Sequence, residues 1–357
     1  MLPHASSCFL PGGRGITLTT MTTMTPVVDA HKIFPIATFI SDLPSNLTPQ
    51  LFSSAENEPT SAGRRLVIVG DVHGMKKSLD ALLEKVNFDK GNGDHLIFVG
   101  DLVNKGPDSP GVIDRAVELG ASAVRGNHDN AVLDAAGEIK ARGDNPMHAG
   151  GITSGSAKLP KGSGAESLSE TVACDGPETS ASPNASPLTR HSATTYSTAR
   201  ALSTRHLDWL AALPLILRIK LPHHSTSSLD DTLLVVHAGL TPGIPLEKQD
   251  PHAVMHMRSL THAPGDEGTL IPAEASGEEG WVAQWDQWQD QLTTRTTVIF
   301  GHDAKRRLQL GRHTIGLDSA CLYGHYLSAL VIESTDRGIE HRIVQVECAD
   351  TPVVPTA

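Results

Sequence analysis

The chain runs Leu-Val-Ile-Val-Gly-Asp-Val-His-Gly over residues 66–74. Four consecutive apolar residues are typical of a strand that is covered on both faces of its sheet. The polar side chains of Asp71 and His73 follow at once, so they lie where that strand ends. The stretch therefore predicts a buried strand that carries metal-type ligands at its carboxyl end.

The same pattern, an apolar run followed by a polar motif, recurs along the chain. Residues 96–99 precede Gly100-Asp101, and residues 121–124 lead into Gly-Asn-His-Asp at 126–129. Apolar residues at helical spacing over 79–86 connect the first two strands, and a helix that begins with Ser109 and Pro110 follows the second. The sequence thus predicts a βαβ unit whose strands end in Asp, Asn and His.

The second half of the chain is predicted to be rich in strands. Residues 233–236 precede His-Ala-Gly at 237–239, and residues 298–300 precede Gly301-His302. Strands that end in Asp, His and Asn side chains suit two divalent metals at the carboxyl edge of a sheet, a pair that hydrolyses phosphate bonds. A helix around 204–213, followed by residues 215–219, is expected to begin the second folded part, and further strands are expected over 314–317, 327–332 and 339–346.

Three segments are expected to lie outside the packed core. Residues 1–62 are rich in Pro, Thr and Ser, which predicts a mostly disordered N-terminal extension. Residues 150–200 consist mainly of Gly, Ser, Ala, Thr and Pro; this composition predicts a disordered low-complexity insertion, because it buries too little apolar surface to offset its ordering entropy. Residues 348–357 form a C-terminal tail. One catalytic domain over residues 63–347 remains, interrupted by the insertion.

Charge and composition restrict the classes of partner. The formal net charge of -11 over 357 residues argues against broad attraction to nucleic acid or anionic membranes. No apolar run approaches the roughly 20 residues that cross a bilayer, and residues 1–28 resemble a transit peptide only faintly, so a cytoplasmic location is the default. The four cysteines are expected to be reduced or buried thiols.

Six strings occur in a fixed order, most of them directly after a predicted strand. They are Gly-Asp-Val-His-Gly at 70–74, Gly-Asp-Leu-Val-Asn-Lys-Gly-Pro-Asp-Ser at 100–109, Val-Arg-Gly-Asn-His-Asp at 124–129, His-Ala-Gly-Leu at 237–240, Gly-His-Asp-Ala at 301–304 and Gly-Leu-Asp-Ser-Ala-Cys-Leu-Tyr-Gly at 316–324. Together they resemble the calcineurin-like metallophosphoesterase superfamily, and within it the ApaH-like phosphatases. The resemblance covers roughly residues 66–130 and 204–346. It implies an α/β fold of the α+β sandwich kind, in which two mixed β-sheets pack face to face with flanking helices.

The resemblance also implies a pair of divalent metal ions, Zn, Mn, Fe or Co, that share one carboxylate. Carboxylate, amide and imidazole ligands suit these ions and leave positions open for water and phosphate. The expected ligands are Asp71 and His73 on the first metal, Asn127, His237 and His302 on the second, and Asp101 on both.

Hydrolysis is expected to proceed by in-line attack of a hydroxide held by the metals at Asp101, without a covalent enzyme intermediate. By family analogy, His128 protonates or stabilises the leaving oxygen. Related serine/threonine phosphatases support the equivalent His with an Asp at the position of Asn104, so the group that orients His128 is left open. Many superfamily members have a second His in the final motif where this chain has Ala304, so His302 is expected to serve the second metal alone.

Three cations are expected to contact phosphate: Lys105, Arg125 and Arg258. The first two lie inside family strings, and Arg258 lies in a Met-Arg-Ser string that resembles the family's phosphate-binding arginine.

Two further groups have more than one interpretation. Trp281, Trp285 and Trp288 fall on one helical face, where core packing is preferred to stacking on a nucleobase. Asp318 and Tyr323 either shape the floor of the pocket or form a turn after a strand.

The predicted function is a metal-dependent phosphoesterase or phosphoanhydride hydrolase that acts on a phosphorylated small molecule or on polyphosphate. Inorganic polyphosphate is the preferred substrate, because the strings look most like those of fungal endopolyphosphatases. Dinucleoside polyphosphates and messenger RNA caps are the next alternatives, followed by phosphoproteins and by a metal-free interaction protein on the same fold. Neither sequence-specific nucleic acid nor a membrane is an expected partner, and the vacuole is an alternative compartment by resemblance.

Overall fold

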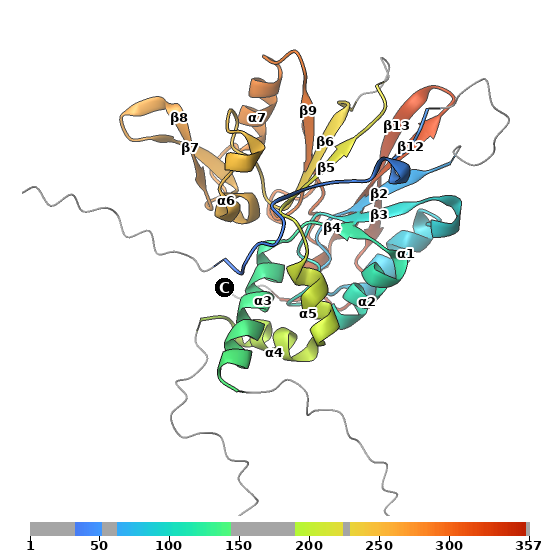
Figure 1. The fold of residues 1–357 in the computed structure, drawn as a ribbon, viewed down its shortest axis with the longest axis vertical. Helices are drawn as coiled ribbons and strands as arrows, with labels where there is room; N and C mark the ends of the chain where they lie inside the picture. Colours follow the sequence, from blue (N-terminus) through green and yellow to red (C-terminus); the bar gives the residue numbers. More distant parts are fainter. Residues whose placement is uncertain (1–32, 52–62, 144–189, 224–228, 355–357) are drawn as a thin grey trace, which may run out of the picture. The chain divides into compact units, whose positions relative to one another are not determined.

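The computed structural model describes residues 33–51, 63–143, 190–223 and 229–354. Two sheets within residues 33–354 contain most of the strands, and a two-stranded hairpin forms a third (Figure 1). In this described part of the chain, none of the helices has the length and apolar character needed to cross a membrane.

The first large sheet has the strand order β13-β12-β2-β3-β4. Its centre is parallel, because β2 pairs with β3 and β3 with β4 in the same direction. The two C-terminal strands, β12 and β13, add to its other side in antiparallel register. The bounds are β2 (Arg65–Val69), β3 (His95–Phe98), β4 (Ser122–Ala123), β12 (Tyr326–Thr335) and β13 (Gly338–Glu347).

The second large sheet has the strand order β1-β5-β6-β9-β11-β10. Here β6, β9 and β11 run parallel to one another, so their carboxyl ends also lie at one edge. The bounds are β1 (Ile40–Asp42), β5 (Ile216–Lys220), β6 (Thr232–Val236), β9 (Thr296–Phe300), β10 (Gln309–Leu310) and β11 (Thr314–Gly316).

Alternate residues of each strand build the core between the two sheets. Leu66, Ile68 and Ile97 of the first sheet are fully buried against Val235 and Ile299 of the second. Because successive side chains of a strand point to opposite faces, the residues between them face outward and are buried in turn by helices. Both sheets are therefore covered on both faces, as their continuous apolar runs predict.

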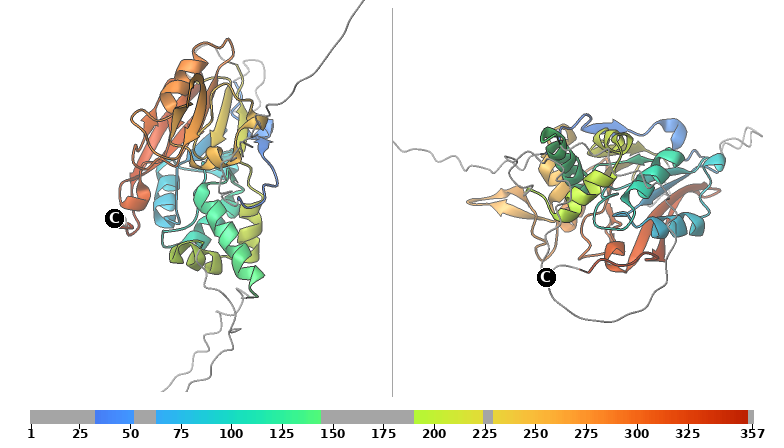
Figure 2. Two further views of the ribbon diagram at one scale, coloured as in Figure 1. Left: turned by 90° about the vertical axis from the view of Figure 1, so that its left-hand side faces the viewer. Right: turned by 90° about the horizontal axis from the view of Figure 1, so that it is seen from below.

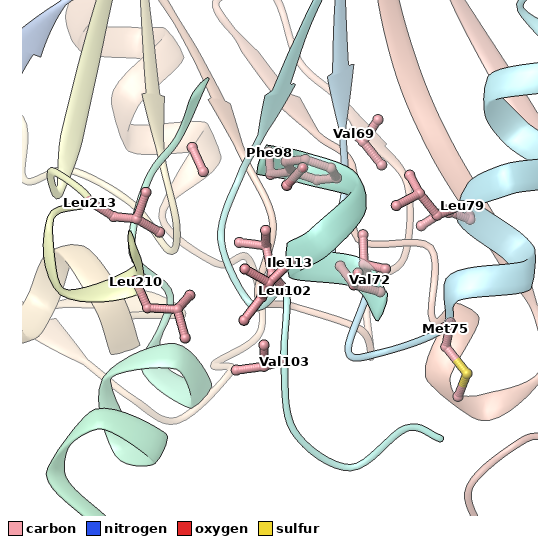
Figure 3. Close-up of a cluster of buried hydrophobic side chains, with 14 of the residues drawn as sticks. Val69, Val72, Met75, Leu79, Phe98, Leu102, Val103, Ile113, Leu210 and Leu213 are labelled. Carbon is pink, nitrogen blue, oxygen red and sulfur yellow. The ribbon is translucent and has the colours of Figure 1, made fainter. Parts of the chain in front are cut away.

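Helices cover the outer face of the first sheet. Val69 and Phe98 pack with Leu79, Ile113 and Leu210 (Figure 3). The helices α1 and α2 lie next to each other, and α3, α4 and α5 form a second group (Figure 1). The bounds are α1 (Lys76–Lys85), α2 (Ser109–Leu119), α3 (Asn127–Ala141), α4 (Ala193–Ala201) and α5 (Thr204–Ala211).

The outer face of the second sheet packs against α6 (Pro251–His256) and α7 (Val282–Gln289). Trp281 and Trp285 are 2% and 3% exposed and belong to this core, as preferred for them on sequence grounds. Between these helices, β7 (Ser259–Ala263) and β8 (Asp266–Ala273) form a hairpin that projects from the neighbouring elements (Figure 2). The sequence analysis did not anticipate this hairpin.

The expected boundaries of the three outer segments differ from the structure. Residues 40–42 of the expected N-terminal extension form β1, which pairs in parallel with β5. Residues 193–201 at the end of the expected insertion form α4, in which Tyr196 is only 4% exposed. In the expected C-terminal tail, Asp350 accepts hydrogen bonds from the backbone N–H and the hydroxyl of Ser78 at the start of α1, at 2.8 and 2.7 Å. The rest of the insertion, 150–189, lies outside the described residues.

A local cap explains why α4 forms despite its composition. The Ser192 hydroxyl accepts a hydrogen bond from the Thr195 N–H at 3.2 Å, which satisfies one free donor of the first turn. Tyr196 packs against the first sheet's helices and donates its hydroxyl to Glu138 at 2.6 Å. The cap and the buried tyrosine therefore allow this low-complexity segment to form a helix.

Candidate metal centre

The loops that follow β2, β3, β6 and β9 and the start of α3 meet at the carboxyl edge of the two sheets. Two groups of buried side chains gather there, Asp71–His73–Asp101 and Asp101–His237–His302. In each group the potential ligand atoms lie within 4.8 Å of one another. Asp101 belongs to both groups, which is the arrangement that a shared carboxylate requires.

Asn127 joins the second group through its side-chain oxygen. Its Oδ1 atom lies 2.9 Å from Nε2 of His237 and 3.1 Å from Nδ1 of His302. The structure therefore brings together the side chains of all six residues that the sequence analysis named as ligands. They come from five separate strings of the chain.

Backbone carbonyls fix which nitrogen of each imidazole faces the cluster. Nδ1 of His237 lies 3.0 Å from the carbonyl oxygen of Val99, and Nε2 of His302 lies 3.0 Å from that of His256. Nδ1 of His73 lies 3.4 Å from the carbonyl of Val103. Since a carbonyl only accepts, each of these nitrogens carries the hydrogen, and the other nitrogen of each ring faces the cluster as a potential metal ligand.

The cluster consequently consists of acceptors that face one another. The second nitrogens of His73 and His237 lie 3.5 and 3.4 Å from Oδ2 of Asp101. Lone pairs on imidazole, amide and carboxylate atoms at such distances repel unless a proton or a cation lies between them. A divalent ion of the type held by mixed nitrogen and oxygen ligands fits this donor set in both groups.

Burial and the neighbouring carboxylates shift the pKa values of the buried groups in different directions. Burial lowers the pKa of His73 to about 3. Burial also acts to lower that of His237, but the carboxylates of Asp101 and Asp71 outweigh it and raise the pKa to about 9. Burial, with the nearby carboxylate of Asp318, raises the pKa of Asp71 well above its usual value. The site therefore favours a positive charge near Asp101 and disfavours further negative charge.

Unusual backbone conformations concentrate around this cluster. Eight described residues other than glycine have a positive φ, and six of them line the pocket in front of the cluster. Such conformations cost roughly 1–3 kcal/mol each and persist where the surrounding structure enforces them. The six are His73, Asp101, Lys105, His302, Arg307 and Ala320.

His128 lies beside the cluster at the first turn of α3. Its backbone N–H donates to Oδ1 of Asp101 at 2.8 Å, and its ring centroid lies 5.0 Å from that of His73. Burial lowers its pKa to about 4, so the ring is neutral at pH 7.

Asn104 is the residue that orients His128. Its Oδ1 accepts the backbone N–H of Lys105 at 2.9 Å, so the amide NH₂ is the group that faces His128, 3.1 Å from Nδ1. The NH₂ group also contacts the hydroxyl of Thr195 on α4 at 3.1 Å. Nδ1 of His128 is therefore an acceptor, and Nε2 carries the hydrogen.

The three predicted phosphate-binding cations do not share one location. Lys105 and Arg258 line the pocket in front of the cluster, as expected. Arg125 does not, and its prediction is wrong: its side chain is fully buried. Its guanidinium donates to the carbonyls of Phe34 at 3.1 Å and Ala211 at 2.6 Å. Arg125 thus ties the N-terminal segment and α5 to the start of α3.

The pocket has a volume of about 620 Å³, within the range of small-molecule sites. Asp318 and Tyr323 line this pocket, which agrees with the first of the two interpretations given for them from the sequence. The side chain of Tyr323 is 36% exposed. The pocket also contains two cations that the sequence analysis missed, Lys305 and Arg307, and the imidazole of His325. The basic run Lys-Arg-Arg directly after the string at 301–304 was the available signal.

Comparison with known proteins agrees with this geometry. The family model described as calcineurin-like phosphoesterase matches residues 64–325. A zinc-dependent endopolyphosphatase of Saccharomyces cerevisiae is 26% identical over 313 residues, which cover 86% of this chain and 88% of the relative. A symmetrical bis(5'-nucleosyl)-tetraphosphatase of Dechloromonas aromatica is 27% identical over 333 residues, with coverage of 80% and 97%.

A solved structure of a candidate diadenosine tetraphosphatase is 30% identical in sequence and has a TM-score of 0.56. The match covers 87% of this chain and 98% of that one, so the predicted fold of two packed mixed sheets is confirmed. The family model and these relatives also confirm the expected enzyme class. The chain belongs to the calcineurin-like phosphoesterase family and is a metal-dependent phosphatase.

Proposed function

We propose that this enzyme hydrolyses phosphoanhydride bonds with two divalent cations, and that inorganic polyphosphate is its substrate. One observation carries the proposal: two ligand groups that share Asp101 open into a pocket that is also lined by two half-buried cations, Lys105 and Arg258. The proposed ligands are Asp71, His73 and Asp101 for one cation, and Asp101, Asn127, His237 and His302 for the other. Zn or Mn is the proposed native metal, because both accept mixed imidazole and oxygen ligands.

When bound, the two cations supply Lewis acidity for the phosphate and lower the pKa of a water molecule toward neutrality. The protein's own groups do the remaining work. Lys105 is half-buried and Arg258 donates to the carbonyl of Glu274 at 3.3 Å, so both are positioned to bind the phosphate oxygens.

His128 is proposed to stabilise the leaving oxygen. The amide of Asn104 occupies Nδ1, so the hydrogen that the ring can donate is on Nε2. Because the ring is neutral, it offers a hydrogen bond rather than a full proton, which suits a phosphate leaving group that departs readily as an anion. Asn104 is a positioning residue in this proposal, because it acts through His128.

The content of the pocket supports a phosphate-rich substrate. Its lining includes the charged side chains of Lys105, Arg258, Lys305 and Arg307, and among the described residues that line it Tyr323 is the one Phe, Tyr or Trp. The zinc-dependent endopolyphosphatase relative supports the same choice. Dinucleoside tetraphosphates are the second candidate, because the exposed ring of Tyr323 offers a surface on which a nucleobase can stack.

Parallel assays on the metal-loaded enzyme test the proposal. Long-chain polyphosphate, diadenosine tetraphosphate, a phosphopeptide and p-nitrophenyl phosphate are offered at equal concentration, with a chelator-treated sample as control. We expect the highest kcat/KM for polyphosphate and loss of activity on chelation. A higher kcat/KM for diadenosine tetraphosphate would select the second candidate, and a higher value for the phosphopeptide would refute both.

A further inference from the structure

Two exposed cations, Lys305 and Arg307, line the pocket together with the imidazole of His325. We propose that this group is a distal phosphate subsite, which holds a phosphate of a linear polyphosphate chain away from the bond that is cleaved. The inference rests on the proposed function and adds a reason for preferring long chains.

The three cations of the run 305–307 have two different roles. Arg306 is not among the residues that line the pocket: its Nη2 donates to the carbonyls of Ser276 at 2.6 Å and Gly277 at 3.0 Å. It also pairs with Asp303 at 3.3 Å. Lys305 and Arg307, one residue to either side, line the pocket instead. Arg306 thus anchors the loop that presents its two neighbours.

The backbone conformation of Arg307 and one side-chain hydrogen bond show that this residue is held in place. Its backbone has a φ of +60°, a left-handed conformation that a long side chain rarely adopts in the absence of restraint. Its Nη2 donates to Nε2 of His325 at 3.0 Å, which leaves the other guanidinium hydrogens available. An arginine that is fixed by a neutral acceptor, with donors to spare, is prepared for a planar array of anionic oxygens.

The charges around this group favour an anion. Among the residues that the structure describes, neither Lys305 nor Arg307 has a carboxylate oxygen within 4.0 Å. Of the two nearby pocket acids outside the ligand cluster, Asp303 pairs with Arg306, and Asp318 is buried and accepts the backbone N–H of Ala320 at 3.0 Å. Lys105 and Arg258 lie close enough to the metal ligands to influence their charges, so a ligand with several phosphates in a row can contact both pairs of cations.

The test compares the double variant Lys305→Gln/Arg307→Gln with a matched double variant, Arg205→Gln/Lys220→Gln. The matched variant removes the same charge from two exposed cations outside the pocket. Binding of fluorescently labelled long-chain polyphosphate to the metal-free proteins is measured in chelator at fixed salt. Steady-state kinetics of the metal-loaded proteins follow, with long-chain polyphosphate and p-nitrophenyl phosphate as substrates.

We expect the pocket variant to bind long polyphosphate about 100-fold more weakly than wild type, or about tenfold per lost charge-assisted contact. Its kcat/KM for the long chain falls at least about tenfold more than that for p-nitrophenyl phosphate, mainly through KM. The charge-preserving variant Lys305→Arg/Arg307→Lys restores most of the loss, and the matched surface variant stays within about twofold of wild type.

Equal binding and equal chain discrimination in the pocket variant and the matched variant would overturn the subsite. A separate outcome would refute the proposed function: wild-type enzyme that cleaves p-nitrophenyl phosphate but no phosphoanhydride. The binding assay distinguishes these cases, because it needs no catalysis. Loss of polyphosphate binding in the pocket variant would still support the subsite even if the chemistry differed.

Discussion

Gly301→Ala should remove a metal without changing any proposed ligand. A Cβ at position 301 would overlap Oδ1 of Asp71, and it would lie 3.0 Å from the carboxylate carbon and 2.7 Å from Cγ2 of Val99. The carboxylate would have to retreat by about 1 Å, whereas metal–ligand distances tolerate about 0.2 Å. Because the N–H of His302 also donates to Asp71 at 3.0 Å, the movement would disturb both ligand groups.

We expect the affinity for the first metal to fall at least about 100-fold, the upper end for changes next to a ligand. Calorimetric titration of the metal-free protein with Zn²⁺ or Mn²⁺ measures this affinity. Gly137→Ala is the matched control: position 137 is exposed on α3 and nothing lies within 4 Å of an added Cβ, so two metals should bind with wild-type affinity. Circular dichroism verifies that both variants are folded. A folded Gly301→Ala protein that binds two metals as tightly as wild type would refute the reasoning.

Three further predictions follow from the same structure. His128→Ala should lower kcat by about 10²- to 10³-fold with two metals retained, because the ring donates a hydrogen bond to the leaving oxygen and holds no cation; loss of metal on elemental analysis would make it a ligand. The pKa of His237 is raised to about 9, so below pH 9 a proton competes with the cation for this imidazole. The apparent metal affinity should therefore fall about tenfold for each pH unit between pH 9 and pH 7. A metal affinity that does not change with pH in calorimetry would contradict this prediction. Tyr196→Ala should lower the free energy of unfolding by about 3 kcal/mol in urea titrations, since the ring is 4% exposed; a change below about 0.5 kcal/mol would show that α4 is not part of the folded domain.

The sheets and the ligand cluster were predictable because they depend on local signals. Runs such as 66–69 are long enough to identify strands that are buried on both faces. A polar motif directly after such a run lies at the carboxyl edge of a parallel sheet, where motifs that are distant in sequence meet. The positions of Asp71, Asp101 and His302 follow from this rule.

The misassigned residues depend on contacts that a motif does not record. Arg125 lies inside a family string, but its guanidinium reaches the carbonyls of Phe34 and Ala211 rather than the pocket. The helix α4 is polar and low in complexity, and it is stable because Tyr196 finds a core that other segments provide. The assignment of Lys305 and Arg307 to the pocket depends on which side chains of a basic run line it, and the sequence does not show this. Long-range packing, not propensity, decided each case.

The proposed catalytic site requires two cations that share the carboxylate of Asp101. The most direct measurement is the metal content of the purified protein after loading with Zn²⁺ or Mn²⁺ and desalting, for wild type and Asp101→Asn. We expect two ions per wild-type chain and loss of both from the variant, because its amide keeps the shape of the bridge but not its charge. Full occupancy in Asp101→Asn, or a wild-type protein that holds no divalent ion, would contradict the account.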